Sequence, residues 1–337
     1  MKIIKINSLK NLEKKLLPAS QAIKKGHLVV FPTETVYGLA ADCFNSQAVN
    51  KIFLAKKRPY SDPLIVHISN ISQLRQLTSN IPKKVKKLID IFWPGPLTIV
   101  VKKNPKVPEI VTAGLNTVAV RFPEDKVARK FIELCNTPLA APSANLFSHV
   151  SATDLQHIIE DFKNEKYIKY VIYTKRPKYG IESTIIDCTK YPFKILRHGA
   201  IPKEEIIEKT GFKIIEIKKV TSIKKSPGQF KKHYSPKKPS YIIKNPVSFV
   251  KKTKDTDFVI VCSNQTKSKL LKIKPKLVII PYGNNIKNIA RNLYFCLRLA
   301  DKMPKKKIYI EPVEMTKLGK SIMDRIIKAT ENKWIDI

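Results

Sequence analysis

Two short polar segments have side chains suited to an anionic ligand. Thr33-Glu34-Thr35 is a hydroxyl-bearing turn after the apolar run 28–31, and Lys56-Lys57-Arg58 is a cation cluster shortly before the apolar run 64–68. Hydroxyl groups and clustered cations at the ends of buried strands are what a phosphate-bearing ligand requires. The pattern therefore indicates an enzyme of nucleotide chemistry.

Two further positions would join these segments if the strand ends face one cleft. Arg121 closes the apolar run 118–120, and its guanidinium could pair bidentately with a carboxylate or a phosphate. Ser143-Ala144-Asn145 ends a run of small residues, whose backbone N–H groups could approach an anion closely. Position alone also allows a surface arginine and an ordinary loop, so each feature is weak by itself.

Several common catalytic and nucleotide-binding patterns are absent from the sequence. The six His are isolated, and there is no GxSxG or HExxH motif for covalent or metal-assisted catalysis. The chain also lacks GxxxxGK[ST] and GxGxxG, which mark the two commonest phosphate-binding loops. Any nucleotide site must therefore be of another design.

Apolar periodicity predicts an α/β fold in two parts. In the first part we expect strands at 28–31, 64–68, 97–101, 118–122 and 181–187, and helices at 46–57 and 153–162. The polar, basic, Pro-containing segment 221–240 indicates a linker. Beyond it we expect strands at 258–262 and 277–282 and helices at 287–301 and 315–329. These patterns predict a first domain at 1–213, a linker at 214–240 and a smaller domain at 241–337.

Composition limits the choice of partner and compartment. The formal net charge of +37 suggests nucleic-acid binding, but only nine of the 64 basic residues are Arg and the Lys are scattered, which favours a general Lys bias. The five Cys form no CxxC pair, so neither disulfides nor zinc are indicated. No apolar run is long enough for a signal peptide or a membrane span. We expect a cytoplasmic protein without membrane association.

At these residues the chain resembles the YrdC/Sua5 family of threonylcarbamoyl-AMP synthases. The matching segments in the first part are, in order, FPTETVYGLAAD, AKKRPYSDPLIVHI, WPGPLTIVV, VAVRFP, APSANLFSHVSATD, GIESTIID and ILRHGAI. SPGQFKKHYSP resembles the linker of the long, two-domain Sua5 type. ARNLYFCLRLAD and LGKSIMDRIIKA resemble parts of the C-terminal domain of that type. The resemblance covers almost the entire chain through several independent motifs.

The resemblance implies a fold and a reaction. The first domain would be a twisted sheet with a concave basic cleft, followed by a linker able to cover that cleft and a Rossmann-like C-terminal domain. The family forms L-threonylcarbamoyladenylate and diphosphate from L-threonine, bicarbonate and ATP, with Mg²⁺ accompanying ATP. The product is used by a separate transferase to modify adenosine 37 of tRNAs that read codons beginning with A. Direct contact with tRNA would be weak.

The resemblance also implies roles for individual residues. The family's KxR motif is matched by the catalytic candidates Lys56 and Arg58. Positions that hold L-threonine are matched by Thr35, His67, Arg121, Ala141 and Ser183. Positions that contact ATP are matched by Arg58, Asp62, Thr117, Ser143, Ser151, Arg197 and Tyr234. No residue is assigned to a metal site of the protein itself.

Three positions depart from the family pattern. Asp62 stands where Asn is common, Ser148 where Gly is usual, and Ala152 where Pro is usual. A carboxylate beside a triphosphate repels it unless the carboxylate binds Mg²⁺ or a neighbouring cation, so a direct contact between Asp62 and ATP is doubtful. The other two changes are compatible with loop variation.

Two other functions are open from the sequence. A non-catalytic RNA-binding protein could use the same basic cleft, but it would need aromatic side chains among the cations, and near Lys56 only Tyr60 is available. A carbamoyl-transferring maturation factor would usually carry zinc-binding modules, and the sequence has no CxxC pair. The synthase remains the favoured hypothesis.

Overall fold

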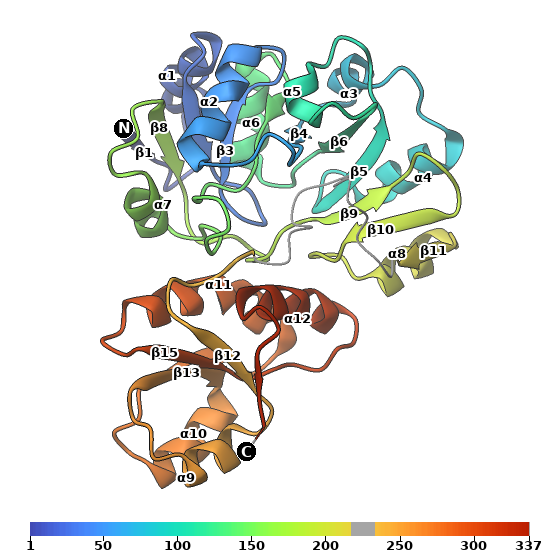
Figure 1. Ribbon diagram of the computed structural model, residues 1–337. Helices are drawn as coiled ribbons and strands as arrows, with labels where there is room; N and C mark the ends of the chain where they lie inside the picture. Colours follow the sequence, from blue (N-terminus) through green and yellow to red (C-terminus); the bar gives the residue numbers. More distant parts are fainter. Residues whose placement is uncertain (217–232, 337) are drawn as a thin grey trace.

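Two units, each built around its own sheet, make up the protein (Figure 1). The computed structural model describes residues 1–216, here the first unit, and residues 233–336, here the second unit. The first unit contains an eleven-stranded sheet and the second a five-stranded sheet. This arrangement confirms the expected α/β fold, with a large sheet followed by a smaller domain.

The sheet of the first unit mixes parallel and antiparallel pairs. Its spatial order is β1-β8-β2-β3-β7-β4-β6-β5-β9-β10-β11. The strands are β1 Lys2–Lys5, β2 Leu28–Phe31, β3 Gly38–Asp42, β4 Ile65–His67, β5 Leu97–Lys102, β6 Thr117–Arg121, β7 Leu139–Ala140, β8 Ile168–Tyr173, β9 Thr184–Asp187, β10 Phe193–Arg197 and β11 Ile214–Glu216. The parallel pairing of β4 with β6 sets His67 beside Arg121, so both polar side chains end buried strands at one edge.

Helices cover this sheet, and four of them begin at a polar residue whose side chain caps them. The helices are α1 Leu12–Lys24, α2 Ser46–Lys56, α3 Ile71–Leu77, α4 Lys83–Phe92, α5 Glu109–Thr112, α6 Lys126–Cys135, α7 Leu155–Phe162 and α8 Lys203–Thr210. At the start of α2, the Asn45 side chain accepts a hydrogen bond from Ala48 N at 3.0 Å. At the start of α6, the Asp125 side chain accepts one from Ala128 N at 2.8 Å. The apolar faces of the helices bury the sheet, which fixes the strand ends that carry polar residues.

The second unit is a parallel α/β sheet with helices on its faces. Its order is β14-β13-β15-β12-β16, and every strand pair described in it is parallel. Its elements are β12 Ser240–Ile243, α9 Pro246–Lys252, β13 Phe258–Ser263, α10 Asn264–Ile273, β14 Ile279–Gly283, α11 Ile286–Lys302, β15 Lys307–Ile310, α12 Leu318–Ala329 and β16 Trp334–Ile335. Helices α11 and α12 lie between the sheet of the second unit and the first unit (Figure 1).

Most predicted elements are present with small shifts at their ends, and two differences matter for the site. The predicted strand 181–187 begins only at Thr184, and Gly180 ahead of it lies against Arg291 of helix α11. Residues 214–216, predicted as linker, pair with β10 as strand β11, and Ser240 opens β12. The predicted linker 221–240 lies largely outside the described residues, which resume at His233.

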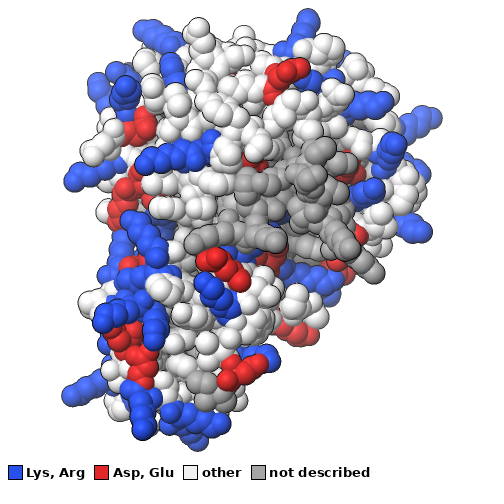
Figure 2. Space-filling view, viewed as in Figure 1, with Lys and Arg blue, Asp and Glu red and all other residues white. Residues whose placement is uncertain are grey.

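On the face drawn in Figure 2, basic side chains are spread over both units. In the view of Figure 2, Lys and Arg project around the outline of both units, with Asp and Glu among them on the second unit. This distribution agrees with the scatter of Lys along the sequence. In the two described ranges, no helix is both long and apolar enough to cross a membrane.

Candidate functional site

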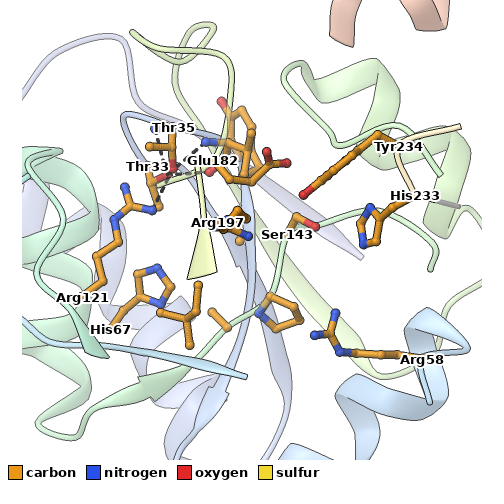
Figure 3. A pocket seen from close by; sticks show the side chains of 16 residues that line it. Thr33, Thr35, Arg58, His67, Arg121, Ser143, Glu182, Arg197, His233 and Tyr234 are labelled. Carbon is orange, nitrogen blue, oxygen red and sulfur yellow. Dashed lines mark hydrogen bonds between the residues drawn. The ribbon is translucent and has the colours of Figure 1, made fainter. Parts of the chain in front are cut away.

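A cavity of about 50 Å³ lies where the strand ends of the first unit meet the segment 233–234 (Figure 3). It is lined by Thr33, Thr35, Val36, Tyr37, Gly38, Arg58, Ile65, His67, Arg121, Ala141, Pro142, Ser143, Glu182, Arg197, His233 and Tyr234. Eight of the residues predicted from sequence are among them: Thr35, Arg58, His67, Arg121, Ala141, Ser143, Arg197 and Tyr234.

One end of the cavity is organised by Arg121, which is 3% exposed. Its Nη1 donates to Thr35 Oγ1 at 2.8 Å, and its Nη2 contacts Glu34 Oε1 at 2.7 Å. Its Nε and the Nδ1 of His67 have no hydrogen-bond partner within the described residues. The guanidinium is therefore held in place with donor capacity to spare, which suits a bound carboxylate.

The histidine at this end is uncharged at neutral pH. Burial, and then the positive charge of Arg121, lower the pKa of His67 to about 3. The ring also packs edge-on against Phe31, with centroids 5.7 Å apart. A neutral imidazole can take part in hydrogen bonding without adding a second cation beside Arg121.

Arg58 lies at the opposite end of the cavity, directly after helix α2 (Figure 3). Its Nε donates to Asp62 O at 3.1 Å, its Nη2 donates to Pro63 O at 3.0 Å, and its Nη2 also lies 2.9 Å from Asp62 Oδ2. Asp62 is completely buried and is not part of the lining. The structure thus places Asp62 behind Arg58, where its carboxylate orients the guanidinium.

His233 and Tyr234 form the wall beside Arg58 and are both buried. Their rings lie 4.1 Å apart, and the Oη of Tyr234 has no hydrogen-bond partner in the described part of the chain. Burial, opposed by the charge of Glu182, lowers the pKa of His233 to about 3. The wall is tied to the first unit next to this pair, because Ser235 N donates to Ser148 O at 2.9 Å.

Arg197 ends strand β10 and projects into the middle of the cavity (Figure 3). It donates to the carbonyl oxygen of Ser183 from Nε at 3.1 Å and from Nη2 at 3.0 Å, and to Ser183 Oγ at 3.1 Å. Ser183 Oγ in turn shares a hydrogen bond of 2.7 Å with Thr98. Ser183 therefore lies behind the lining and fixes Arg197.

Lys56 is also close to the site without being part of its lining. Its side chain is 1% exposed, and its Nζ donates to the carbonyl oxygens of Ser143, at 2.5 Å, and Asn145. Burial, followed by the charge of Arg58, holds the pKa of Lys56 well below its usual range. In this structure Lys56 shapes the loop that carries Ser143.

Two predicted positions remain. Ser151 Oγ donates to Glu182 Oε1 at 2.7 Å, so Ser151 supports a residue of the lining. Thr117 is not brought to the cavity, because it begins strand β6 and pairs with Lys102, whereas Arg121 ends the same strand. Thr117 lies instead in a surface depression of the first unit.

Among the lining residues that sequence reasoning missed are a carboxylate, Glu182, and an imidazole, His233. Both lie inside matched segments, GIESTIID and SPGQFKKHYSP, so the signal was present in the motifs. Glu182 is a carboxylate in a cavity that also holds three arginines. The residues of the two described ranges form no group of three or more His, Cys, Asp or Glu able to hold a metal ion.

The cavity and its two-unit scaffold agree with the comparisons with known proteins. Residues 21–199 match the family described as "Telomere recombination" (Sua5, YciO and YrdC), and residues 201–330 match the family "Threonylcarbamoyl-AMP synthase, C-terminal domain". The threonylcarbamoyl-AMP synthase of Pyrococcus abyssi is 37% identical, over 98% of this chain and 99% of that protein. The synthase of Bacillus subtilis is 33% identical, over 98% and 96% respectively.

The fold also matches that of a solved structure. The crystal structure of P. abyssi Sua5 complexed with L-threonine has a TM-score of 0.90 and 36% sequence identity, and the match covers 100% of both chains. Two family matches, full-length relatives and a full-length structural match therefore coincide. The chain belongs to the YrdC/Sua5 family of threonylcarbamoyl-AMP synthases, in its long form with the Sua5 C-terminal domain.

Proposed function

We propose that this chain joins L-threonine, bicarbonate and ATP into L-threonylcarbamoyl-AMP and releases diphosphate. The observation that carries the proposal is the arrangement of the cavity, with a fixed arginine beside a hydroxyl and a neutral imidazole at one end and further arginines toward the other. The family supports the same reaction, since its relatives are named threonylcarbamoyl-AMP synthases.

L-Threonine would bind at the Arg121 end. Its carboxylate would take the unused donors of Arg121, whose Nη atoms are already oriented by Thr35 and Glu34. The backbone at Ala141 and the imidazole of His67 would complete this subsite, because both line the same end. A substrate amine held here points its nitrogen along the cavity toward the nucleotide.

ATP would bind toward Arg58, Arg197, Ser143 and Tyr234. Two buried guanidiniums in a low-dielectric site attract phosphate oxygens more strongly than the same groups do in water. Mg²⁺ would enter with the triphosphate rather than through a resident site. The carboxylates near the cavity, Glu34, Asp62 and Glu182, already pair with arginines, and the described residues form no metal-binding group.

The reaction then needs no protein nucleophile. The threonine nitrogen attacks carbon dioxide derived from bicarbonate and loses a proton, which gives a carbamate. A carbamate oxygen attacks the α-phosphorus of ATP, and the bond from that phosphorus to the bridging oxygen breaks as diphosphate leaves. Positioning and charge neutralisation supply most of the rate enhancement in such transfers. The buried wall of His233 and Tyr234 would keep water from the mixed anhydride.

The product is proposed to pass to a tRNA threonylcarbamoyl transferase for modification of adenosine 37. Nothing on the visible face of the molecule favours RNA binding as the main function, since the positive charge is dispersed over both units (Figure 2). We therefore expect tRNA contact to be weak and the low-molecular-weight product to be the link to the next enzyme.

Release of diphosphate tests the proposal. Purified protein with Mg²⁺, ATP and bicarbonate should release diphosphate only when L-threonine is present, and omission of bicarbonate should remove the signal. Equal release without threonine would mean simple ATP hydrolysis. No release from folded protein would reject the synthase.

A further inference from the structure

Glu182 is an unexpected residue in a cavity proposed to bind a triphosphate. It lies in the connection before β9, is 5% exposed and shares the lining with Arg58, Arg121 and Arg197. A carboxylate near phosphates repels them unless its charge is balanced. The first unit balances it in part, through the hydroxyl of Ser151 at 2.7 Å and the positive charge of Arg197.

The remaining partners of Glu182 come from the second unit. Arg325 of helix α12 donates to Glu182 Oε2 from both Nε and Nη2 at 3.1 Å, and its side chain is completely buried. Tyr294 of helix α11 donates from Oη to Oε2 at 2.8 Å and to Oε1 at 3.0 Å. Burial alone would raise the pKa of Glu182, but Arg325 and then Arg197 lower it to about 2, so the carboxylate is ionised and paired.

Arg325 and Tyr294 also contact Tyr234, a second residue of the cavity lining. The ring of Tyr234 stacks on the ring of Tyr294, with centroids 5.5 Å apart and an interplanar angle of 26°. The guanidinium carbon of Arg325 lies 5.5 Å from the centroid of the Tyr234 ring, within the range of a cation–π contact. Arg325 and Tyr294 therefore touch two lining residues, Glu182 and Tyr234, at once.

The backbone around Glu182 is shaped for this contact between the units. Gly180 has φ +71°, and a Cβ built on it would lie 2.4 Å from the Cα of Arg291 in helix α11. A Cβ on Gly199 would lie 2.3 Å from the carbonyl carbon of Ser183. Only glycine permits both approaches. The connection that holds Glu182 is thus pressed between its own sheet and the second unit.

We propose that Arg325 and Tyr294 are positioning residues for the synthase reaction, which act from the second unit by neutralising Glu182 and by seating Tyr234 against the nucleotide end of the cavity. The inference deepens the proposed function and rests on it. It assigns the C-terminal domain an indirect part in substrate binding, since its buried cation adds to the charge balance of a site formed mainly by the first unit.

The charge argument predicts which kinetic constant changes. When Arg325 is replaced by an apolar residue, Glu182 keeps its burial and loses its strongest counter-charge, so the cavity becomes less favourable for the triphosphate than for the zwitterionic amino acid. ATP binding should weaken more than threonine binding. A purely structural loss would instead lower kcat and weaken the binding of ATP and threonine together.

The experiment compares Arg325→Met with the double variant Arg325→Met/Glu182→Gln, and uses Lys320→Met as a control. Lys320 also bridges the units, 3.0 Å from Glu204, but lies outside the cavity lining. We expect Arg325→Met to raise the KM for ATP about tenfold or more, as couplings within one network commonly do. The threonine KM should change less than about threefold, by the same reasoning. The added Glu182→Gln change should recover most of the loss, and the control should behave as the unchanged protein.

Two results would overturn the inference: an unchanged ATP KM in folded Arg325→Met, or no recovery in the double variant. If Arg325→Met fails to fold, Tyr294→Phe decides, because it removes one hydroxyl and keeps the ring stacked on Tyr234; an unchanged ATP KM there rejects the proposal. Calorimetric binding of ATP to the same proteins separates this inference from the reaction. A difference in ATP affinity supports the positioning role even if the unchanged protein makes no adenylate.

Discussion

Replacing Arg121 by Lys tests the threonine subsite with little damage to the fold. Arg121 faces Glu34 at 2.7 Å, and both side chains are 4% exposed. Arg121→Ala would leave a buried carboxylate without its cation, which costs about 3–5 kcal/mol of stability, so lost activity would have two explanations. Lysine keeps the positive charge beside Glu34 but cannot present a planar fork to a second carboxylate.

The expected effect follows from the hydrogen bonds that lysine cannot make. In the proposed complex the carboxylate of threonine takes the free Nε of Arg121 and one further N–H, and a hydrogen bond to a charged group contributes about 1.5–3 kcal/mol. Loss of one such bond corresponds to about 1.5–3 kcal/mol. At about 1.4 kcal/mol per factor of ten, the threonine KM should rise roughly 10- to 100-fold.

The assay is threonine-dependent diphosphate release, with threonine varied at saturating ATP and bicarbonate. The exposed Arg75→Lys variant controls for a general effect of the exchange, and a thermal melt confirms that Arg121→Lys is folded. We expect the ATP KM to change little, because Arg58 and Arg197 remain. A threonine KM within threefold of the unchanged protein would refute the assignment of Arg121 to the carboxylate.

Three other predictions concern stability and the loops around the site. The folded-state pKa values of His67 and His233 are about 3, so below pH 6.5 the unfolded chain binds more protons than the folded protein. The free energy of unfolding should therefore be full above pH 6.5 and fall by about 2 kcal/mol per histidine at pH 5. Chemical denaturation above pH 6.5 and at pH 5 measures the difference. Gly180→Ala should cost about 2–5 kcal/mol, through its positive φ and its clash with Arg291, and a lower Tm than in an alanine variant of exposed Gly114 would show it. Lys56→Met should raise the KM values for both ATP and threonine, because it releases the loop that carries Ser143. Unchanged KM values with a lower kcat would instead favour a direct role of Lys56 in catalysis.

The sequence was sufficient for the parts of the fold that depend on local patterns. Alternating and continuous apolar runs located strands such as β2 and β13, and amphipathic periods located helices such as α2 and α11, with ends shifted by one or a few residues. The start of β9 was predicted three residues too early. Ahead of this strand, Gly180 lies against Arg291 of helix α11, a contact that no local pattern contains.

The candidate site was predictable from motifs as a set of residues, but not as an arrangement. The matched segments led to Arg121, His67 and Arg197, which all line the cavity. They could not show that Lys56 and Asp62 lie behind the lining and hold lining residues in place, because that depends on which carbonyl or guanidinium lies within reach after folding. The role of the second unit was least visible, since the contact between Glu182 and Arg325 joins residues 143 positions apart.

The most direct test of the synthase function is mass spectrometry of the nucleotide formed from isotope-labelled bicarbonate, L-threonine, ATP and Mg²⁺. Our account predicts threonylcarbamoyl-AMP with the labelled carbon between the threonine nitrogen and the phosphate, formed in equal amount to diphosphate. Formation of AMP alone, or of a threonine adduct of AMP without the labelled carbon, would contradict it.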